Sequence, residues 1–144
     1  PEETAISVSH VRNKTDLNLW KEVSFAGFDF PASTKGSYAG FVDAFNLRPD
    51  SPQRLYLAYC NDRPAATSLL FLQEDKAGIY FVSTLSEYRK KGIGLALTRE
   101  MMRHAKMRGV RSATLQSSPD GLHVYQRAGF KEQCLVDVYS LKPI

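Results

Sequence analysis

The sequence predicts an α/β fold built on a mixed β-sheet, with elements in the order β-α-α-β-β-β-α-β-α-β. Three strand-like runs joined by short turns, at 54–60, 65–73 and 79–84, indicate an antiparallel meander. From Gly92 the hydrophobic period changes to that of a helix, so a strand–helix–strand unit follows the meander. Because 144 residues is the size of one domain, residues 1–144 are expected to form a single domain.

The region before the meander is predicted to hold one strand and two helices. Residues 6–11 alternate between apolar and polar side chains, which is typical of a strand. Thr15 is suited to cap a helix that includes Trp20 and that Gly27 is expected to end. A second short helix is predicted over 37–45, followed by a loop.

The region after the meander begins with a long helix. Ile93, Leu97 and Met101 recur at helical spacing, which predicts one buried face. Gly109 is suited to the left-handed residue that ends such a helix. A short strand is then predicted over 112–116.

The last part of the chain is predicted to form a helix and a closing strand. Ser118 and Pro119 have the residue types of a helix cap and of a first helical position. Gly129 is suited to end that helix. Residues 133–141 alternate again, which predicts the closing strand.

The positive charge is concentrated in one segment. The net charge is +4, from 19 basic and 15 acidic side chains, but residues 89–111 hold eight bases and one acid. Such a segment can meet nucleic acid, a membrane surface or a phosphorylated small molecule, or it can form a solvated helix face. Nucleic acid is disfavoured because the bases fall on different faces of the helix, with no interleaved aromatic side chains.

The composition excludes several classes of protein. No stretch approaches the roughly 20 apolar residues of a membrane span, and charges in the first thirty residues argue against a secretory signal. Cys60 and Cys134 lie far apart and the histidines do not cluster, so neither a disulfide framework nor a metal site is expected. A reducing, cytoplasmic location is therefore the expectation.

The segment 86–97, SEYRKKGIGLAL, carries the chemistry. A strand ends, a loop follows, and a helix begins at Gly92 and Gly94, which leave the backbone open to a ligand. The first turn of a helix has N–H groups without partners, and with the helix dipole they form an anion site. The alternative is a glycine-assisted turn with a basic surface. Three side chains add full positive charge: Arg89, Lys90 and Lys91.

Three kinds of phosphate-binding loop compete for this segment. A Walker loop needs GxxxxGK[ST], which is absent. A dinucleotide fingerprint needs Gly or Ala where this chain has Leu97. The pattern R/Q-x-x-G-x-G/A is matched in full by residues 89–94, and through it the segment resembles the GNAT superfamily of N-acetyltransferases.

The resemblance extends over about residues 53–141. The segment 118–130, SPDGLHVYQRAGF, is similar to the family pattern N-x-x-A-x-x-L-Y-x-x-x-G-F. The family usually has a further strand after the one predicted at 133–141, and we expect that strand to be missing here. Ser118, Gly121 and Val124 depart from the pattern, whereas Tyr125, Gly129 and Phe130 match it.

The resemblance implies acetyl-CoA as the acetyl donor, with no metal. The donor would lie where the strands at 79–84 and 112–117 splay apart, with its pyrophosphate on the N–H groups of 90–95 and its pantetheine along the first of these strands. The residues implied to contact it are Val82, Thr84, Arg89, Lys90, Lys91, Gly92, Ile93, Gly94, Leu95 and Ser118.

The implied reaction is direct attack of a primary amine on the thioester, with a backbone N–H stabilising the carbonyl oxygen. Tyr125 is the candidate general acid for the leaving thiolate, and the alternative role is a buried anchor. An unperturbed phenol is the weaker acid by roughly 1.5 pKa units, so proximity or a lowered pKa must offset about 2 kcal/mol. No general base is assigned, because Gly78 and Tyr80 stand where some family members have Glu or His.

The acceptor is expected to be a small-molecule amine, in a pocket built by the region from the first to the second helix and by the end strands. Most aromatic side chains of that region are expected to pack in the core, and one or two to line the pocket. Asp29 and Asp43 are candidates to attract a cation there, and the alternative is a solvated loop charge. The alternatives are a protein or peptide amine, and a GNAT-like module that binds acyl-CoA without turnover. Many family members dimerise, and a homodimer stays open for this chain. The aromatic residues of the region are Phe25, Phe28, Phe30, Tyr38, Phe41 and Phe45.

Overall fold

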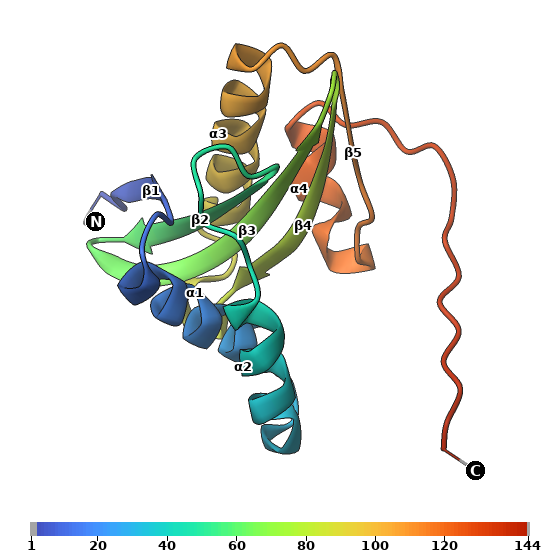
Figure 1. Ribbon diagram of the computed structural model, residues 1–144. Coiled ribbons are helices and arrows are strands. Elements are labelled where there is room, and N and C mark those ends of the chain that lie inside the picture. Colours follow the sequence, from blue (N-terminus) through green and yellow to red (C-terminus); the bar gives the residue numbers. More distant parts are fainter. Residues whose placement is uncertain (1–2, 144) are drawn as a thin grey trace.

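A five-stranded mixed sheet forms the centre of the molecule. The computed structural model describes residues 3–143, and the strands lie in the order β1-β2-β3-β4-β5 (Figure 1). The first four strands are antiparallel neighbours, whereas β4 and β5 are parallel, which confirms the predicted fold class. The strands are β1 (Ile6–His10), β2 (Gln53–Cys60), β3 (Arg63–Gln73), β4 (Lys76–Thr84) and β5 (Ser112–Leu115).

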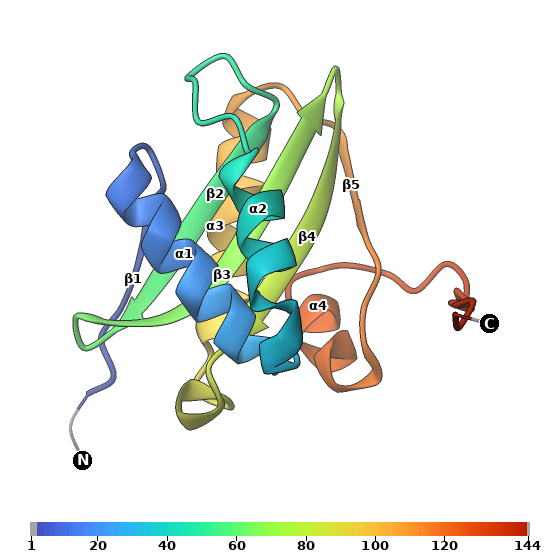
Figure 2. The same cartoon turned by 60° about the horizontal axis from the view of Figure 1, so that its bottom comes forward.

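Helices cover both faces of the sheet. On one face lie α1 (Lys14–Gly27) and α2 (Lys35–Asp43), whose packing over β3 and β4 is clear in Figure 2. On the other face lies α3 (Ile93–Met107), with the short α4 (Leu122–Arg127) against it. Each face has its own buried core, because the strands carry apolar side chains on both sides. Short 3₁₀ turns precede α2, α3 and α4 at Ala32–Thr34, Ser86–Tyr88 and Pro119–Gly121.

The predicted helix ends differ from the structure at two places. Asn13 rather than Thr15 caps α1, since its Oδ1 accepts a hydrogen bond of 2.8 Å from the Asp16 N–H. The second helix begins and ends two residues earlier than the predicted 37–45. Both differences are within the usual uncertainty of helix boundaries.

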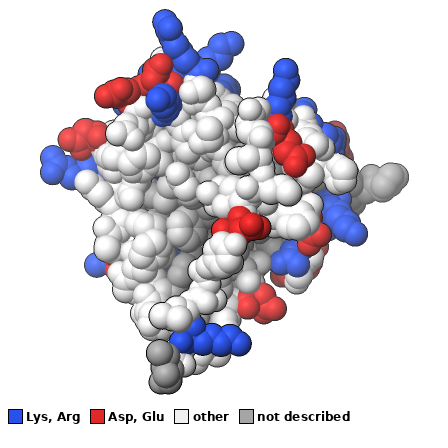
Figure 3. Space-filling model, turned by 90° about the vertical axis from the view of Figure 1, so that its right-hand side faces the viewer, with Lys and Arg blue, Asp and Glu red and all other residues white. Residues whose placement is uncertain are grey.

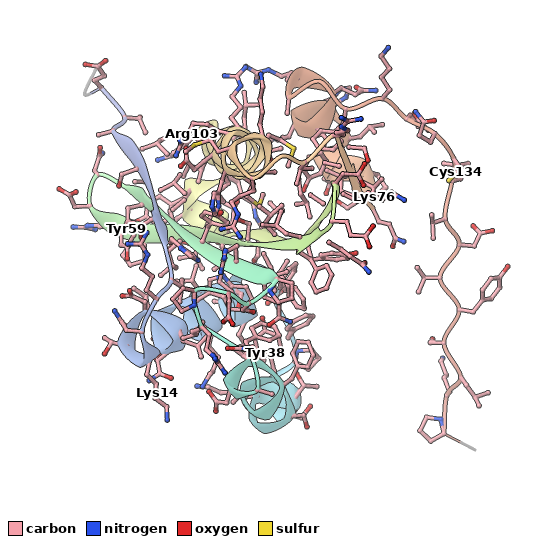
Figure 4. All side chains as sticks on the ribbon, turned by 45° about the horizontal axis from the view of Figure 1, so that its top comes forward. Lys14, Tyr38, Tyr59, Lys76, Arg103 and Cys134 are labelled. Atoms are coloured by element: carbon pink, nitrogen blue, oxygen red, sulfur yellow. The ribbon has the colours of Figure 1, made fainter. Side chains whose placement is uncertain are left out.

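The predicted closing strand at 133–141 is wrong. Residues 128–143 form no regular element, and the segment leads away from the sheet (Figures 1 and 4). Leu135, Val138 and Leu141 are 88%, 88% and 92% exposed. Alternation specifies a strand only where a neighbouring edge accepts its backbone hydrogen bonds. Among the described residues this segment pairs with no strand.

Gly27 is required by close packing rather than by a left-handed conformation. A Cβ added there would lie 2.1 Å from Ser83 Oγ and 3.3 Å from Ser83 Cβ, so α1 ends directly against β4. The positive φ that follows α1 belongs to Asp29. The glycine thus fixes where the end of α1 meets the end of β4.

We expect Gly27→Ala to lower the free energy of unfolding by about 1–3 kcal/mol, the usual cost of overpacking. Urea denaturation measures this loss. Ser83→Ala removes the nearest atom, so the double variant Gly27→Ala/Ser83→Ala should recover part of the stability. A single variant as stable as the parent protein would contradict the close approach.

Among residues 3–143, no helix is both long and apolar enough to cross a membrane.

Candidate functional site

Half of β4 lacks a partner on the side of β5. The two strands pair only from Lys76 to Ile79, opposite Ser112–Leu115, although β4 continues to Thr84. The register between β3 and β4 also shifts at this level, and Phe81 has a φ of 53°, which marks a bulge. Because a bulge bends the strand that carries it, β4 diverges from β5 and leaves an open edge beyond Ile79.

The loop after β4 leads to an exposed helix N-terminus. Lys90 and Gly92 both have positive φ, at 59° and 81°, and Gly92 is the N-cap of α3. Successive turns of this kind aim backbone N–H groups at one point, as in an anion-binding nest. A Cβ added to Gly92 would meet no atom within 4 Å. The first-turn N–H groups have no helical acceptor, so they are available to a ligand.

The side chains near this helix terminus divide into buried and exposed ones. Ile93 and Leu95 point into the core, so only their backbone N–H groups face the loop. Lys90 and Lys91 are exposed, and Lys91 Nζ lies 5.7 Å from the centre of the Tyr88 ring. Two exposed cations thus stand in the loop directly before the first turn of α3.

Arg89 lies differently from the two lysines. Its Nε donates to the Thr84 carbonyl at 3.1 Å, and its Nη2 donates to the Gly27 carbonyl at 3.0 Å. The guanidinium therefore joins the end of β4 to the end of α1. The structure does not bring it together with the N–H groups of α3, and the Thr84 carbonyl is already engaged.

This geometry predicts different effects for two neighbouring charge removals. Arg89→Gln is expected to lower the free energy of unfolding by about 1 kcal/mol, since it removes two charge-assisted hydrogen bonds at a partly exposed site. Lys90→Gln is the matched control and should leave stability unchanged. Thermal denaturation of both variants checks this, and equal stability of the two would contradict the anchoring role of Arg89.

Tyr125 is brought near the same helix terminus by α4. A Cβ added to Gly94 would lie 3.6 Å from Val124 Cγ1, so α4 packs against the first turn of α3. The Tyr125 ring lies edge-on to Phe130, with centroids 6.2 Å apart. A Cβ added to Gly121 would lie 3.2 Å from this ring, so the glycine leaves room for the ring.

Burial raises the pKa of Tyr125 above its ordinary value. A lowered pKa is therefore not available to offset the weak acidity of the phenol, and proximity is left as the offset. Ser118 Oγ accepts a hydrogen bond of 3.2 Å from the Gly121 N–H, which confirms it as the cap of the turn before α4. This bond uses one of the two acceptor lone pairs of the Ser118 hydroxyl.

An aromatic cluster lines the α1–α2 side of the open edge. Phe81, which the sequence did not single out, stands at its centre and contacts Phe41 at a centroid distance of 5.9 Å. Phe41 and Tyr80 are 51% and 54% exposed. Tyr80 lies over Gly78, whose missing side chain leaves room for the ring. The face that bears β5 and the C-terminal segment is mostly uncharged, with acidic atoms near its centre and a hollow beside them (Figure 3).

Other polar side chains of interest do not meet at this edge. Asp43 forms an ion pair with Lys21, so its negative charge already has a partner within the protein. His10 and His104 lie in a separate cavity against α3, on the other side of the sheet. Within residues 3–143, no group of three or more metal-ligating side chains comes together. The arrangement therefore offers anion binding, an unpaired strand edge, a phenol and an aromatic wall.

Comparisons with known proteins identify a matching family and several similar folds. Residues 36–120 match the model of the acetyltransferase (GNAT) domain family. A comparison with curated proteins found no significant match. An aminoglycoside N-acetyltransferase, AAC(6')-Iy, in complex with the bisubstrate analogue CoA-S-monomethyl-acetylneamine is similar at a TM-score of 0.76 and 17% identity, over 96% of this chain and 99% of that one.

Two further solved structures share the fold. Glucosamine-6-phosphate N-acetyltransferase from Arabidopsis thaliana has a TM-score of 0.73 at 13% identity, over 96% of this chain and 99% of that one. A structure from Pyrococcus horikoshii has a TM-score of 0.73 at 20% identity, over 89% of this chain. This chain covers 44% of the Pyrococcus protein, so it spans less than half of its length.

Proposed function

This chain belongs to the GNAT acetyltransferase family, and on that basis we propose that it transfers the acetyl group of acetyl-CoA to the primary amine of a small molecule. The observation that carries the proposal is the open edge of β4 in front of the first turn of α3. We further propose that residues 1–144 act as one domain in this reaction.

The donor site rests on backbone groups. The N–H groups of Ile93, Gly94 and Leu95 would hold the pyrophosphate, with Lys90 and Lys91 adding charge. The empty space at Gly92 fits a ligand that approaches the backbone closely. Acetyl-CoA supplies an activated acyl group as a thioester. Ser118 caps the turn before α4, and α4 packs against α3, so Ser118 is proposed to lie beside the donor as well.

The strand edge would bind the extended part of the donor as an added strand does. Since Arg89 occupies the Thr84 carbonyl, we assign this pairing to the backbone of Val82 first. A backbone N–H at Val82 or Thr84 would also stabilise the negative charge on the carbonyl oxygen during attack. Both roles use the backbone, so neither needs a particular side chain at these positions.

Tyr125 is the proposed general acid. Its raised pKa keeps the phenol protonated at neutral pH, as a proton donor must be. The same shift makes the donation less favourable, so the phenol must lie close to the leaving sulfur. No base is assigned, and the acceptor amine would lose its proton to water.

The aromatic wall supports a small acceptor with an apolar portion. Phe41, Tyr80 and Phe81 present ring surface beside the open edge. Rings attract ammonium groups as well as apolar ones, which suits an amine before it loses its proton. Two structural neighbours are named for small amine-bearing acceptors, aminoglycosides and glucosamine-6-phosphate.

A screen of amines tests this proposal. The protein, acetyl-CoA and a panel of aminoglycosides, amino sugars, aryl-alkyl amines and lysine peptides are combined, and release of free thiol is followed. We expect amine-dependent release with a small-molecule class. Turnover confined to the peptides would instead assign a protein or peptide acceptor.

A second candidate function is an acyl-CoA-binding module without turnover. The raised pKa of Tyr125 and the lack of an assigned base favour it. Tight acetyl-CoA binding with no thiol release across the panel would select this function. Thiol release with any amine class would exclude it.

A further inference from the structure

A second cavity lies between α3, β1 and β2, on the face opposite the aromatic wall. Its volume is about 750 Å³. It is lined by the second half of α3, between Glu100 and Arg108, whereas the proposed donor site lies at the first turn. Gly94 and His104 are ten residues apart, or about 15 Å along a helix axis, so the two sites are separate.

The cavity has an excess of positive charge. Four guanidinium groups and one carboxylate line it, and the carboxylate of Glu100 already accepts two hydrogen bonds from Arg103. Three guanidinium groups remain without an acidic partner among the described residues. Figure 4 shows Arg103 on the side of α3 turned toward β1. The four arginines are Arg12, Arg54, Arg103 and Arg108.

Arg54 is the deepest of these cations. The residue is only 3% exposed, and its guanidinium donates to the backbone carbonyls of Arg48 and Pro49. A guanidinium has five donors, so the carbonyl bonds leave some of them unused. Asp50 attracts this charge but forms its ion pair with Arg48. Burying a charge without a counter-charge in direct contact is costly, and an anion in the cavity would lower that cost.

An imidazole–phenol cluster forms the wall between these cations. Tyr56 and His104 share a hydrogen bond, and the His10 ring stacks on Tyr56 with centroids 5.5 Å apart. Burial, with the charges of Arg12 and Arg54, lowers the pKa of His10 to about 4, and burial beside Arg54 and Arg108 lowers that of His104. Both rings are therefore neutral at pH 7. A bound anion would favour their protonated, positively charged form.

We propose that this cavity binds a small phosphomonoester, with the phosphate between Arg12, Arg54 and Arg108 and the organic part against the rest of the wall. A dianion matches three guanidinium groups that have no acidic partner among the described residues, and such groups bind phosphate through paired N–H donors. The volume exceeds that of phosphate alone. Val8, Leu47 and Pro49 supply the apolar surface for an organic portion. The inference does not depend on the proposed acetyl transfer.

Calorimetry with phenyl phosphate tests the site. The double variant Arg12→Gln/Arg108→Gln removes two exposed cations and should weaken binding by about tenfold or more, at about 1.4 kcal/mol per factor of ten. Arg99→Gln removes the same charge from α3 outside the cavity, and Gly94→Asp blocks the helix N-terminus. Both should bind phenyl phosphate within about twofold of the parent protein.

Three results would overturn the site. They are no binding by the parent protein at millimolar concentrations, loss of binding in Gly94→Asp with retention in the double variant, and an equal loss in Arg99→Gln. The pH dependence of inorganic sulfate binding gives a further test, because the charge of sulfate stays constant from about pH 7.5 to 5.5. A bound anion would offset the cations that lower the pKa of His10 and His104, so both pKa values should rise on binding. Sulfate binding should then take up protons and strengthen as the pH falls.

The charged and titratable groups that face these imidazoles are the arginines already named, Glu100 and Tyr56. None of these changes charge in that pH range, so the histidines alone set the dependence. A constant sulfate affinity would contradict an anion placed against the imidazoles.

Discussion

Gly94→Asp is expected to weaken acetyl-CoA binding by about 100-fold or more, which corresponds to about 2.7 kcal/mol. The new carboxylate would stand in the first turn of α3, where the donor's pyrophosphate is proposed to bind. Two like charges about 4 Å apart repel by about 4 kcal/mol at an effective dielectric constant of about 20. The protein itself should fold, because an added Cβ meets only Val124 Cγ1 at 3.6 Å and an acid in a first turn is favourable.

The chain offers a matched control for this change. Gly40 is an exposed helical glycine in α2, and a Cβ added there would meet no atom within 4 Å. Gly40→Asp thus adds the same side chain and charge to a helix surface away from the loop. Calorimetry should find acetyl-CoA affinity retained in Gly40→Asp. Equal acetyl-CoA affinities of the two variants would contradict the proposal that the donor binds at this helix terminus.

Tyr125→Phe is expected to lower kcat for acetyl transfer by about 10²–10³-fold, within the usual contribution of a general acid. The Kd for acetyl-CoA should stay unchanged, because the phenol hydroxyl is not assigned to donor binding. Single-turnover kinetics and calorimetry measure the two quantities. Tyr139→Phe, in the exposed C-terminal segment, is the matched control. A Tyr125→Phe enzyme with full kcat would leave the ring as a packing anchor only.

The pH profile follows from the direction of the Tyr125 shift. Because burial raises this pKa, the phenol stays protonated beyond its ordinary range near ~10. The rate should therefore rise with pH as the acceptor amine loses its proton, with no fall below about pH 10 from loss of the phenolic proton. An alkaline fall at lower pH that disappears in Tyr125→Phe would contradict the raised pKa.

The sequence predicted the features that depend on local patterns. The meander and the long helix follow from apolar spacing, and the turn that leads into α3 follows from the residues around Gly92 and Gly94. The cap at Ser118 also followed from residue type and was found in the structure. These features depend on near neighbours in the chain, which a single sequence displays directly.

Features that depend on distant contacts were not predictable. The binding of Arg89 to the Gly27 carbonyl joins residues 62 positions apart. The bulge at Phe81 depends on pairing with β3, and no residue type there signals it. The segment 133–141 alternates like a strand, yet forms none, because pairing needs a neighbouring edge as well as a pattern. The cavity around Arg54 likewise gathers residues from three separate elements.

Titration of acetyl-CoA into the intact protein by calorimetry tests the central claim most directly, because every proposed catalytic role presupposes donor binding at the open edge of β4. The account predicts one site per chain with a Kd on the order of micromolar, within the usual range for enzyme substrates. No measurable heat of binding at millimolar acetyl-CoA, from protein shown to be folded, would contradict it.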